Sequence, residues 1–114
     1  RDQKEERSNS AAKKAMLYIQ ENYSKDISLD DVSGLVNISP YYFSKIFKEE
    51  TGENFIEYLT KIRIEKAKEF LVKPDISIKE AGIRSGYTDP NYFSRIFKKQ
   101  TDMTPSEYKT RYGE

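Results

Sequence analysis

Apolar residues recur along this chain at spacings of three and four, which is the period of an amphipathic α-helix. The first such run predicts a helix over about residues 10–23. Its apolar members are Ala12, Met16, Ile19 and Tyr23. A longer run predicts a second helix over 54–73, which ends before Pro74 because the residue before a proline disfavours helical geometry. No segment shows a convincing strand pattern, so the chain is expected to be all-α.

The same pattern occurs twice. Residues 27–58 recur at 76–108 with an offset of 49 residues, which becomes 50 after a one-residue insertion at Asp89. Ten of the nineteen positions in 40–58 are identical in 90–108. In the first copy these positions are Pro40, Tyr42, Phe43, Ser44, Ile46, Phe47, Lys48, Thr51, Glu57 and Tyr58. Coincidence does not explain this agreement, and the chain therefore contains a duplicated unit.

Each copy predicts a helix, a tight turn and a second helix. Ser28 heads the first copy, and Ser77 opens a capping box in which Glu80 reaches back to the free amides. Asn37 and Gly86 lie in the turns, where either residue type adopts a left-handed conformation easily. The second helices begin at Ser39-Pro40 and Asp89-Pro90, and Thr104-Pro105 starts a short last helix.

We therefore expect seven helices arranged as two helix-turn-helix subdomains joined by a long linker helix. The expected segments are a charged linker at 1–9, a first subdomain at 10–53, the linker helix at 54–73 and a second subdomain at 74–114. Gly82 falls inside the fifth helix, where glycine costs about 1 kcal/mol relative to alanine. We accordingly expect the second subdomain to be the more labile of the two.

Composition narrows the chemistry. The chain has 114 residues, 20 Lys plus Arg against 19 Asp plus Glu, and neither Cys nor His. It therefore lacks the residues for a disulfide, a thiol nucleophile, a zinc knuckle or a Ser-His-Asp triad. We expect no enzyme, no catalytic residues, no metal and no cofactor. The absence of a long apolar run argues against a membrane span, and a first residue of Arg1 rather than Met indicates a piece of a longer cytoplasmic protein.

The second helix of each copy exposes residue types that recognise base edges. Arg and Lys suit guanine, Asn suits adenine, and Ser suits either. The candidate base-contacting residues are Tyr41, Ser44 and Lys45 in the first copy and Asn91, Ser94 and Arg95 in the second. The candidate phosphate-contacting residues are Lys48, Lys98 and Lys99 along these helices and Ser28 and Ser77 at helix starts.

A simpler interpretation is that these faces are merely solvated. Their place on the second helix of a helix-turn-helix, their duplication and the length of the linker helix favour duplex DNA. About 20 residues at 1.5 Å each span about 30 Å, close to the ~34 Å between successive major grooves. Aromatic residues such as Tyr87 and Phe55 also suit stacking on single strands, but core packing explains most of them more simply. Arg63 interrupts the apolar arc of the linker helix, and a structural ion pair explains it better than a ligand contact.

The segment GYTDPNYFSRIFKKQTDMTPSEY, residues 86–108, resembles the signature of the AraC/XylS family of bacterial transcription regulators. The resemblance extends over about residues 10–112 and is strongest to response regulators with such a C-terminal output domain. It implies third and sixth helices that enter adjacent major grooves, and its base-reading positions fall on the six residues named above. The chain departs from the family pattern at Ala81, Gly82, Ser85 and Asp102.

The resemblance implies sequence-specific binding of double-stranded DNA at a bipartite site with half-sites about one helical turn apart. It also implies an N-terminal receiver or sensor domain outside this fragment, and RNA polymerase as a candidate partner. The isolated domain is expected to be monomeric. A helical protein-interaction module that docks a transcription or signalling partner is the alternative. An enzyme that uses carboxylate pairs is a distant third, because no two acidic residues stand out from the solvated faces and no glycine-rich phosphate loop is present.

Overall fold

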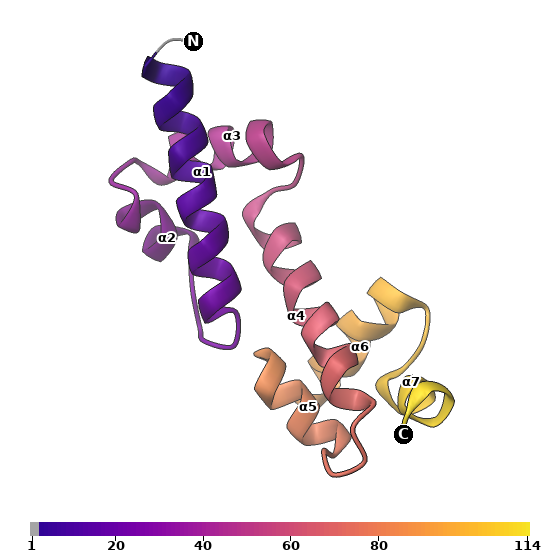
Figure 1. Cartoon of the computed structure of the whole chain (residues 1–114). Helices are drawn as coiled ribbons and strands as arrows, with labels where there is room; N and C mark the ends of the chain where they lie inside the picture. Colours follow the sequence, from indigo (N-terminus) through magenta and orange to yellow (C-terminus); the bar gives the residue numbers. More distant parts are fainter. Residues whose placement is uncertain (1–2) are drawn as a thin grey trace. The chain divides into compact units, whose positions relative to one another are not determined.

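The computed structural model describes the backbone of residues 3–114 and the side chains from Ser10 onward. Over these residues the chain forms seven α-helices and no strand, which confirms the all-α expectation (Figure 1). The helices are α1 (Gln3–Asn22), α2 (Leu29–Leu35), α3 (Pro40–Thr51), α4 (Phe55–Leu71), α5 (Ile78–Ser85), α6 (Pro90–Thr101) and α7 (Pro105–Tyr112). The chain divides into two compact units, Arg1–Leu59 and Thr60–Glu114, with the division inside α4.

Two helices differ in length from the sequence prediction. α1 begins at Gln3 rather than at about residue 10, so most of the segment expected as a charged linker is helical. Lys, Glu, Gln and Arg are good helix formers, and extending an existing helix costs much less than starting one. Apolar periodicity cannot detect such an extension. α4 has 17 residues, which gives it a length of about 26 Å instead of about 30 Å.

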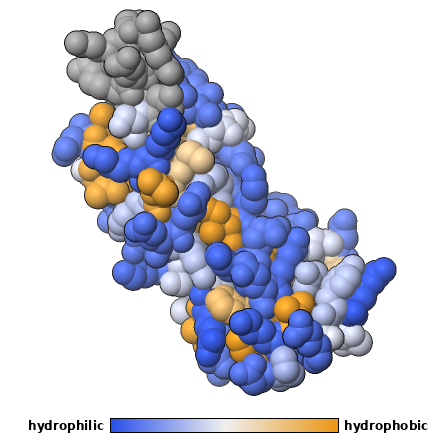
Figure 2. Space-filling model, in the orientation of Figure 1, coloured by the Kyte–Doolittle hydropathy of each residue, from blue (hydrophilic) through white to orange (hydrophobic). Residues whose placement is uncertain are grey.

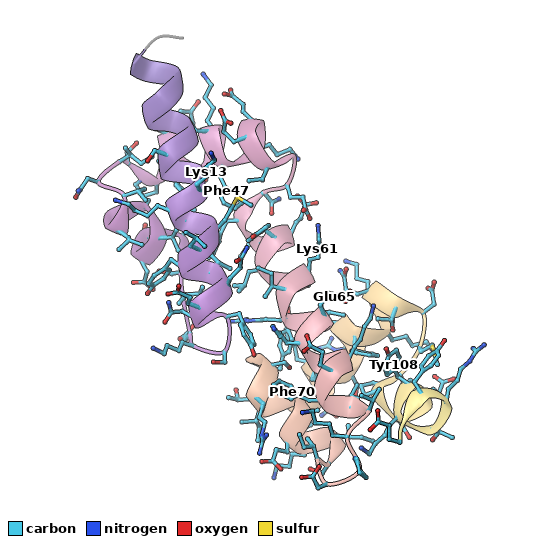
Figure 3. All side chains as sticks on the ribbon, viewed as in Figure 1. Lys13, Phe47, Lys61, Glu65, Phe70 and Tyr108 are labelled. Atoms are coloured by element: carbon cyan, nitrogen blue, oxygen red, sulfur yellow. The ribbon has the colours of Figure 1, made fainter. Side chains whose placement is uncertain are left out.

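In the first unit, α1 packs against both helices of the helix-turn-helix. Ala12, Ala15 and Ile19 on α1 are at most 1% exposed. Phe47 on α3 lies at the centre of an aromatic group, with ring centroids 5.3 Å from Phe43 and 5.4 Å from Tyr58 (Figure 3). α1 thus covers the apolar side of α3, which leaves the other side of α3 to solvent.

In the second unit, the C-terminal half of α4 contributes Ile64, Ala67 and Leu71 to the buried core. The core joins residues of α4, α5 and α6, and Phe70 and Tyr108 pack against it from α4 and α7 (Figure 3). Its buried members are Ile64, Ala67, Leu71, Ile76, Ala81, Tyr87, Phe93 and Phe97. Ile56, an apolar residue in the first turn of α4, is 64% exposed.

Gly82 of α5 lies against the ring of Phe93 on α6. A Cβ atom at this position would lie 2.8 Å from Cδ2 of Phe93, whose ring is itself buried. The residue is therefore required by packing as well as being a weak helix former. The corresponding residue of the first copy is Ser33, which is also buried. Greater lability of the second unit stays a prediction.

The helix starts agree with the sequence prediction except in one detail. Ser77 Oγ accepts a hydrogen bond from the Glu80 backbone N–H at 3.1 Å. The Glu80 carboxylate does not complete a capping box; it accepts from Arg84 at 2.9 Å and 3.2 Å. The capping box predicted at Ser77 is therefore wrong, because an arginine one turn later competes for the carboxylate. Reciprocal boxes form instead at Ser28 with Asp31 and at Thr104 with Glu107.

The predicted turns are confirmed by the backbone angles. Asn37 has a φ of 59° and Gly86 a φ of 110°, both in the left-handed region. Gly52 and Asp102 end α3 and α6 in the same conformation, with φ values of 82° and 65°. In both copies a threonine hydroxyl, of Thr51 or Thr101, bonds back to the helix at 2.8 Å. The duplication therefore extends from sequence to local hydrogen bonding.

Candidate nucleic-acid interface

The exposed side of α3 is set by how this helix starts and what it buries. Ser39 Oγ accepts the Tyr42 backbone N–H at 3.2 Å and Pro40 occupies the first turn, which fixes the direction of the helix. Phe43, Ile46 and Phe47 are at most 3% exposed. The helical period then turns a different set outward, which we name the α3 face: Tyr41, Ser44, Lys45 and Lys48. Tyr41 is 84% exposed, an unusual state for a tyrosine.

α6 repeats this arrangement. Oδ1 of Asp89 accepts the backbone N–H groups of Asn91 at 2.9 Å and Tyr92 at 3.3 Å. Phe93 and Phe97 are buried. The residues turned outward form the α6 face: Asn91, Ser94, Arg95 and Lys98. Ser44 and Ser94 are half-buried, and the other members of both faces are exposed. Within each unit, the structure thus brings the sequence-predicted base-contacting residues onto one face of one helix.

Lysine side chains on both faces lie near glutamates that cap the next helix. Lys48 Nζ is 3.9 Å from Oε1 of Glu57, with both side chains more than half exposed. In the second copy the positive charge of Lys98 helps to lower the pKa of Glu107, although the larger cause is the hydrogen bond from the Thr104 backbone N–H. Exposed ion pairs contribute little. Either lysine can therefore leave its glutamate for a phosphate group at little cost in free energy.

Arg95 is the end member of a chain of ring contacts. Its Cζ lies 5.8 Å from the ring centroid of Tyr92, and that ring lies 5.8 Å from the ring of Tyr87. Arg63 of α4 lies over the ring of Tyr87, with its Cζ 5.4 Å from the ring centroid. Burial raises the pKa of Tyr87, and the positive charge of Arg63 opposes this shift. The phenol is therefore protonated at neutral pH.

Sequence reasoning placed Tyr87 in the core but missed this connection. Tyr87 is 7% exposed, in agreement with the core interpretation. Arg63 contacts the ring of Tyr87, and the ion pair expected for it stays a prediction. One difference between the copies could have indicated this contact. The residue after the turn is Tyr87 in the second copy, where it can contact another ring, and Ile38 in the first copy, where it cannot.

The two candidate serines at helix starts are not equivalent. Ser28 donates its backbone N–H to Oδ2 of Asp31 at 2.9 Å, so a carboxylate occupies the start of α2. Glu80 leaves the backbone N–H of Ser77 unused because it pairs with Arg84. Ser77 is therefore the better placed of the two for a phosphate, and contact with DNA remains a prediction for both. Lys99 is exposed in the last turn of α6.

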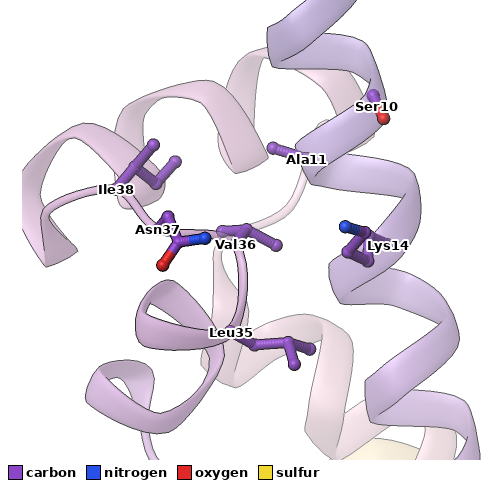
Figure 4. A pocket seen from close by; sticks show the side chains of 7 residues that line it. All are labelled: Ser10, Ala11, Lys14, Leu35, Val36, Asn37 and Ile38. Carbon is purple, nitrogen blue, oxygen red and sulfur yellow. The ribbon is translucent and has the colours of Figure 1, made fainter.

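Two hollows in the surface of the described residues offer little reactive chemistry. The larger, of about 350 Å³, lies between α1 and the turn after α2, and Lys14 is its sole titratable lining residue (Figure 4). The smaller, of about 180 Å³, lies beside α6 and is edged by Lys79, Thr88 and Ser94. Hydrophilic residues dominate the face shown in Figure 2. Among the described residues, no group of three or more acidic side chains is placed to hold a metal ion, and no helix is long and apolar enough to cross a membrane.

The chain has two helix-turn-helix units, and the second helix of each unit exposes cationic side chains. These features place it in the class of helix-turn-helix proteins. A family model described as a helix-turn-helix domain matches residues 32–111, which is most of the chain. The chain belongs to the AraC/XylS family and is a DNA-binding domain of a transcription regulator. This confirms the resemblance drawn from residues 86–108.

Regulatory protein PocR of Salmonella typhimurium is 36% identical to this chain over 106 residues. That match covers 93% of the chain but 35% of PocR, so the chain spans about a third of this relative's length. The C-terminal domain of AraT, a response regulator of Geobacillus stearothermophilus, is 39% identical, with a TM-score of 0.87 and coverage of 91% of this chain and 87% of that one. The C-terminal domain of the two-component response regulator yesN of Fusobacterium nucleatum is 33% identical, with a TM-score of 0.83 and coverage of 88% and 98%.

Proposed function

We propose that this domain binds double-stranded DNA sequence-specifically and that the α3 face and the α6 face read bases in adjacent major grooves. The observation that carries the proposal is the recurrence of one exposed constellation on the second helix of both units. Each face has a polar or aromatic residue near the helix start, a serine one turn later and a cation beside it. The second helix is the element that helix-turn-helix proteins insert into the major groove.

Phosphate contacts position the domain in this proposal. Lys48, Lys98 and Lys99 lie further along the helices than the base-contacting residues, and Ser77 adds a backbone N–H at the start of α5. The net charge of the chain is +1. A weak overall field gives modest non-specific affinity, so sequence preference has to come from the two faces together.

One copy of the domain carries both reading faces and therefore binds a bipartite site as a monomer, with half-sites about one helical turn apart. The solved relatives that are output domains of response regulators support an N-terminal receiver domain as the controlling partner. RNA polymerase is a second proposed partner. The protein acts in the cytoplasm in this proposal and performs no catalysis itself.

The test is a pair of alanine substitutions measured on a duplex selected from a random pool. Arg95→Ala and Lys45→Ala should each weaken specific binding by about 1–3 kcal/mol and flatten the preference at one base pair each. Lys66→Ala, which affects an exposed ion pair of α4 with Glu69, is the matched charge control and should leave the base preference unchanged.

Wild-type affinity should also fall steeply as salt rises, because lysine–phosphate contacts release condensed counterions. Unchanged base preference in both Arg95→Ala and Lys45→Ala would remove these residues from the interface. If the domain did not bind duplex DNA at all, the alternative function, a protein-interaction module, would be favoured.

A further inference from the structure

The two reading faces differ in what supports their central cation. Lys45 on α3 corresponds to Arg95 on α6, and Ile38 corresponds to Tyr87. A contact between two rings at the positions of Tyr87 and Tyr92 is therefore excluded in the first copy, because Ile38 has no ring. The contact between the rings of Tyr87 and Tyr92, beside Arg95, is therefore a feature of the second unit alone.

The contacts that hold Tyr87 in place begin on α4. Tyr87 is buried, and its hydroxyl is hydrogen-bonded to the side chains of Thr60 and Arg63. Its ring also stacks on Phe93, with an interplanar angle of 26° and centroids 5.7 Å apart. Tyr87 is thus held from both sides, by polar contacts to α4 and by a core ring of α6. It cannot change its rotamer without losing several contacts at once.

Tyr92 transmits this rigidity to the surface. Tyr92 is 48% exposed, and its ring lies 5.8 Å from that of Tyr87 at an angle of 56°, so one part of the ring contacts a fixed neighbour. Its other neighbour is the guanidinium of Arg95, with Cζ at 5.8 Å from the centroid. A guanidinium that lies over an aromatic ring is restrained in orientation while its edge donors stay available.

Such restraint matters because recognition of guanine by arginine is bidentate. Two N–H donors have to meet O6 and N7 in one plane, and a freely rotating arginine loses conformational entropy when it does so. A side chain that is already oriented loses less, which strengthens the correct contact relative to an incorrect one. A lysine presents a point charge and gains much less from being oriented.

We propose that Tyr92 and Tyr87 are positioning residues that orient Arg95, so that the α6 face reads its base pair more stringently than the α3 face reads its own. This inference rests on the proposed function, because it presupposes that Arg95 contacts a base. Tyr92 acts through Arg95 and touches no base in this proposal. The ligand feature that it serves is a guanine at one defined position of the site.

The test compares discrimination at single base pairs. Discrimination is the ratio of the Kd for a duplex with one altered base pair to the Kd for the selected duplex. Arg95→Ala first identifies the base pair that Arg95 reads. Tyr92→Leu should then lower discrimination at that base pair about two- to fivefold, the range expected for an exposed cation–π contact. Discrimination at the base pair read by Lys45 and the slope of affinity against salt should not change.

Conservative and matched variants separate orientation from general damage. Tyr92→Phe keeps the ring and should keep full discrimination. Tyr42→Leu makes the same change in the first copy and should leave the Arg95 base pair unaffected. In an Arg95→Ala background, Tyr92→Leu should have no further effect on discrimination, because the group it orients is gone. Equal discrimination by wild type and Tyr92→Leu would overturn the inference.

A measurement on the free protein keeps the inference testable without DNA. The side-chain protons of Arg95 should resonate upfield of their random-coil positions in NMR spectra, since they lie near the Tyr92 ring. Tyr87→Ile, which copies the first unit, should move them toward random-coil values. Random-coil positions in the wild type would overturn the inference. A wild type that prefers no duplex sequence would instead refute the proposed function, and the two failures are thus distinguishable.

Discussion

Replacing Lys109 by Met tests how the second unit is held together. The ammonium group of Lys109, on α7, donates to three backbone carbonyls at the end of α4 and in the segment that follows it. The acceptors are Leu71 O at 3.0 Å, Lys73 O at 2.9 Å and Ile76 O at 2.8 Å. An ammonium has three N–H donors, so all of them are used. Methionine keeps most of the apolar stem and removes the donors.

The cost follows from the surroundings of these carbonyls. The bonds to Leu71 O and Ile76 O are partly buried, and each such carbonyl costs about 1–1.5 kcal/mol when it loses its partner. The positive charge at the C-terminal end of α4 adds about 0.5 kcal/mol. The bond to Lys73 O is exposed and water replaces it. We therefore expect Lys109→Met to lower the free energy of unfolding of the second unit by about 2.5–3.5 kcal/mol.

The assay is a urea titration followed by amide NMR signals of each unit separately. The midpoint for amides of α5, α6 and α7 should fall, while that for amides of α2 and α3 should stay within error. Lys66→Met is the matched control, because it removes a lysine charge whose exposed ion pair with Glu69 spans 3.6 Å, and it should cost less than 1 kcal/mol. A midpoint in Lys109→Met no lower than in Lys66→Met would refute the reasoning.

Substitutions at three further positions test local features. Gly82→Ala should destabilise the second unit by about 1 kcal/mol net in urea unfolding, because overpacking against Phe93 costs about 1–3 kcal/mol and helix propensity returns about 1; a more stable variant would contradict the packing argument. The folded-state pKa of Glu107 is lowered, so its contribution to stability is present above the unfolded pKa and is lost as pH falls through the folded pKa. The stability difference between wild type and Glu107→Gln should therefore shrink from pH 7 to pH 3, and a constant difference would argue against the capping role. Asp89→Ala should cost about 1 kcal/mol in thermal unfolding and Asp89→Asn much less, whereas equal losses would indicate that charge rather than capping matters.

Local rules carried most of the fold prediction. Ser39-Pro40 and Asp89-Pro90 start α3 and α6 as expected, since capping chemistry depends on residues adjacent in sequence. Asn37 and Gly86 adopt the predicted left-handed turns for the same reason. The identification of the buried and exposed sides of α3 and α6 followed from helical period alone.

Features that depend on competition or on distant contacts were not predictable in this way. Glu80 had two partners within reach, Ser77 N–H and Arg84, and sequence spacing does not say which one prevails. Gly82 appeared as a weak helix residue until the position of Phe93 was known. The Lys109 contacts join residues more than 30 positions apart, and no periodicity announces them.

The candidate site also has features that local sequence predicts and features that depend on distant contacts. The members of each face followed from the sequence, whereas the ring chain from Arg63 to Arg95 required tertiary structure. The start of α1 at Gln3 was missed because the charged residues there form a helix without apolar periodicity. Which bases each face contacts remains a proposal that DNA-binding measurements have to test.

Selection of bound duplexes from a random pool tests the central claim most directly. The domain is allowed to bind at moderate salt, and the recovered sequences are aligned without assuming any site. Two short conserved blocks centred about ten base pairs apart should emerge, one flattened by Lys45→Ala and the other by Arg95→Ala. Recovery of a single block, or of sequences with no shared block, would contradict the claim that both helix-turn-helix units read DNA.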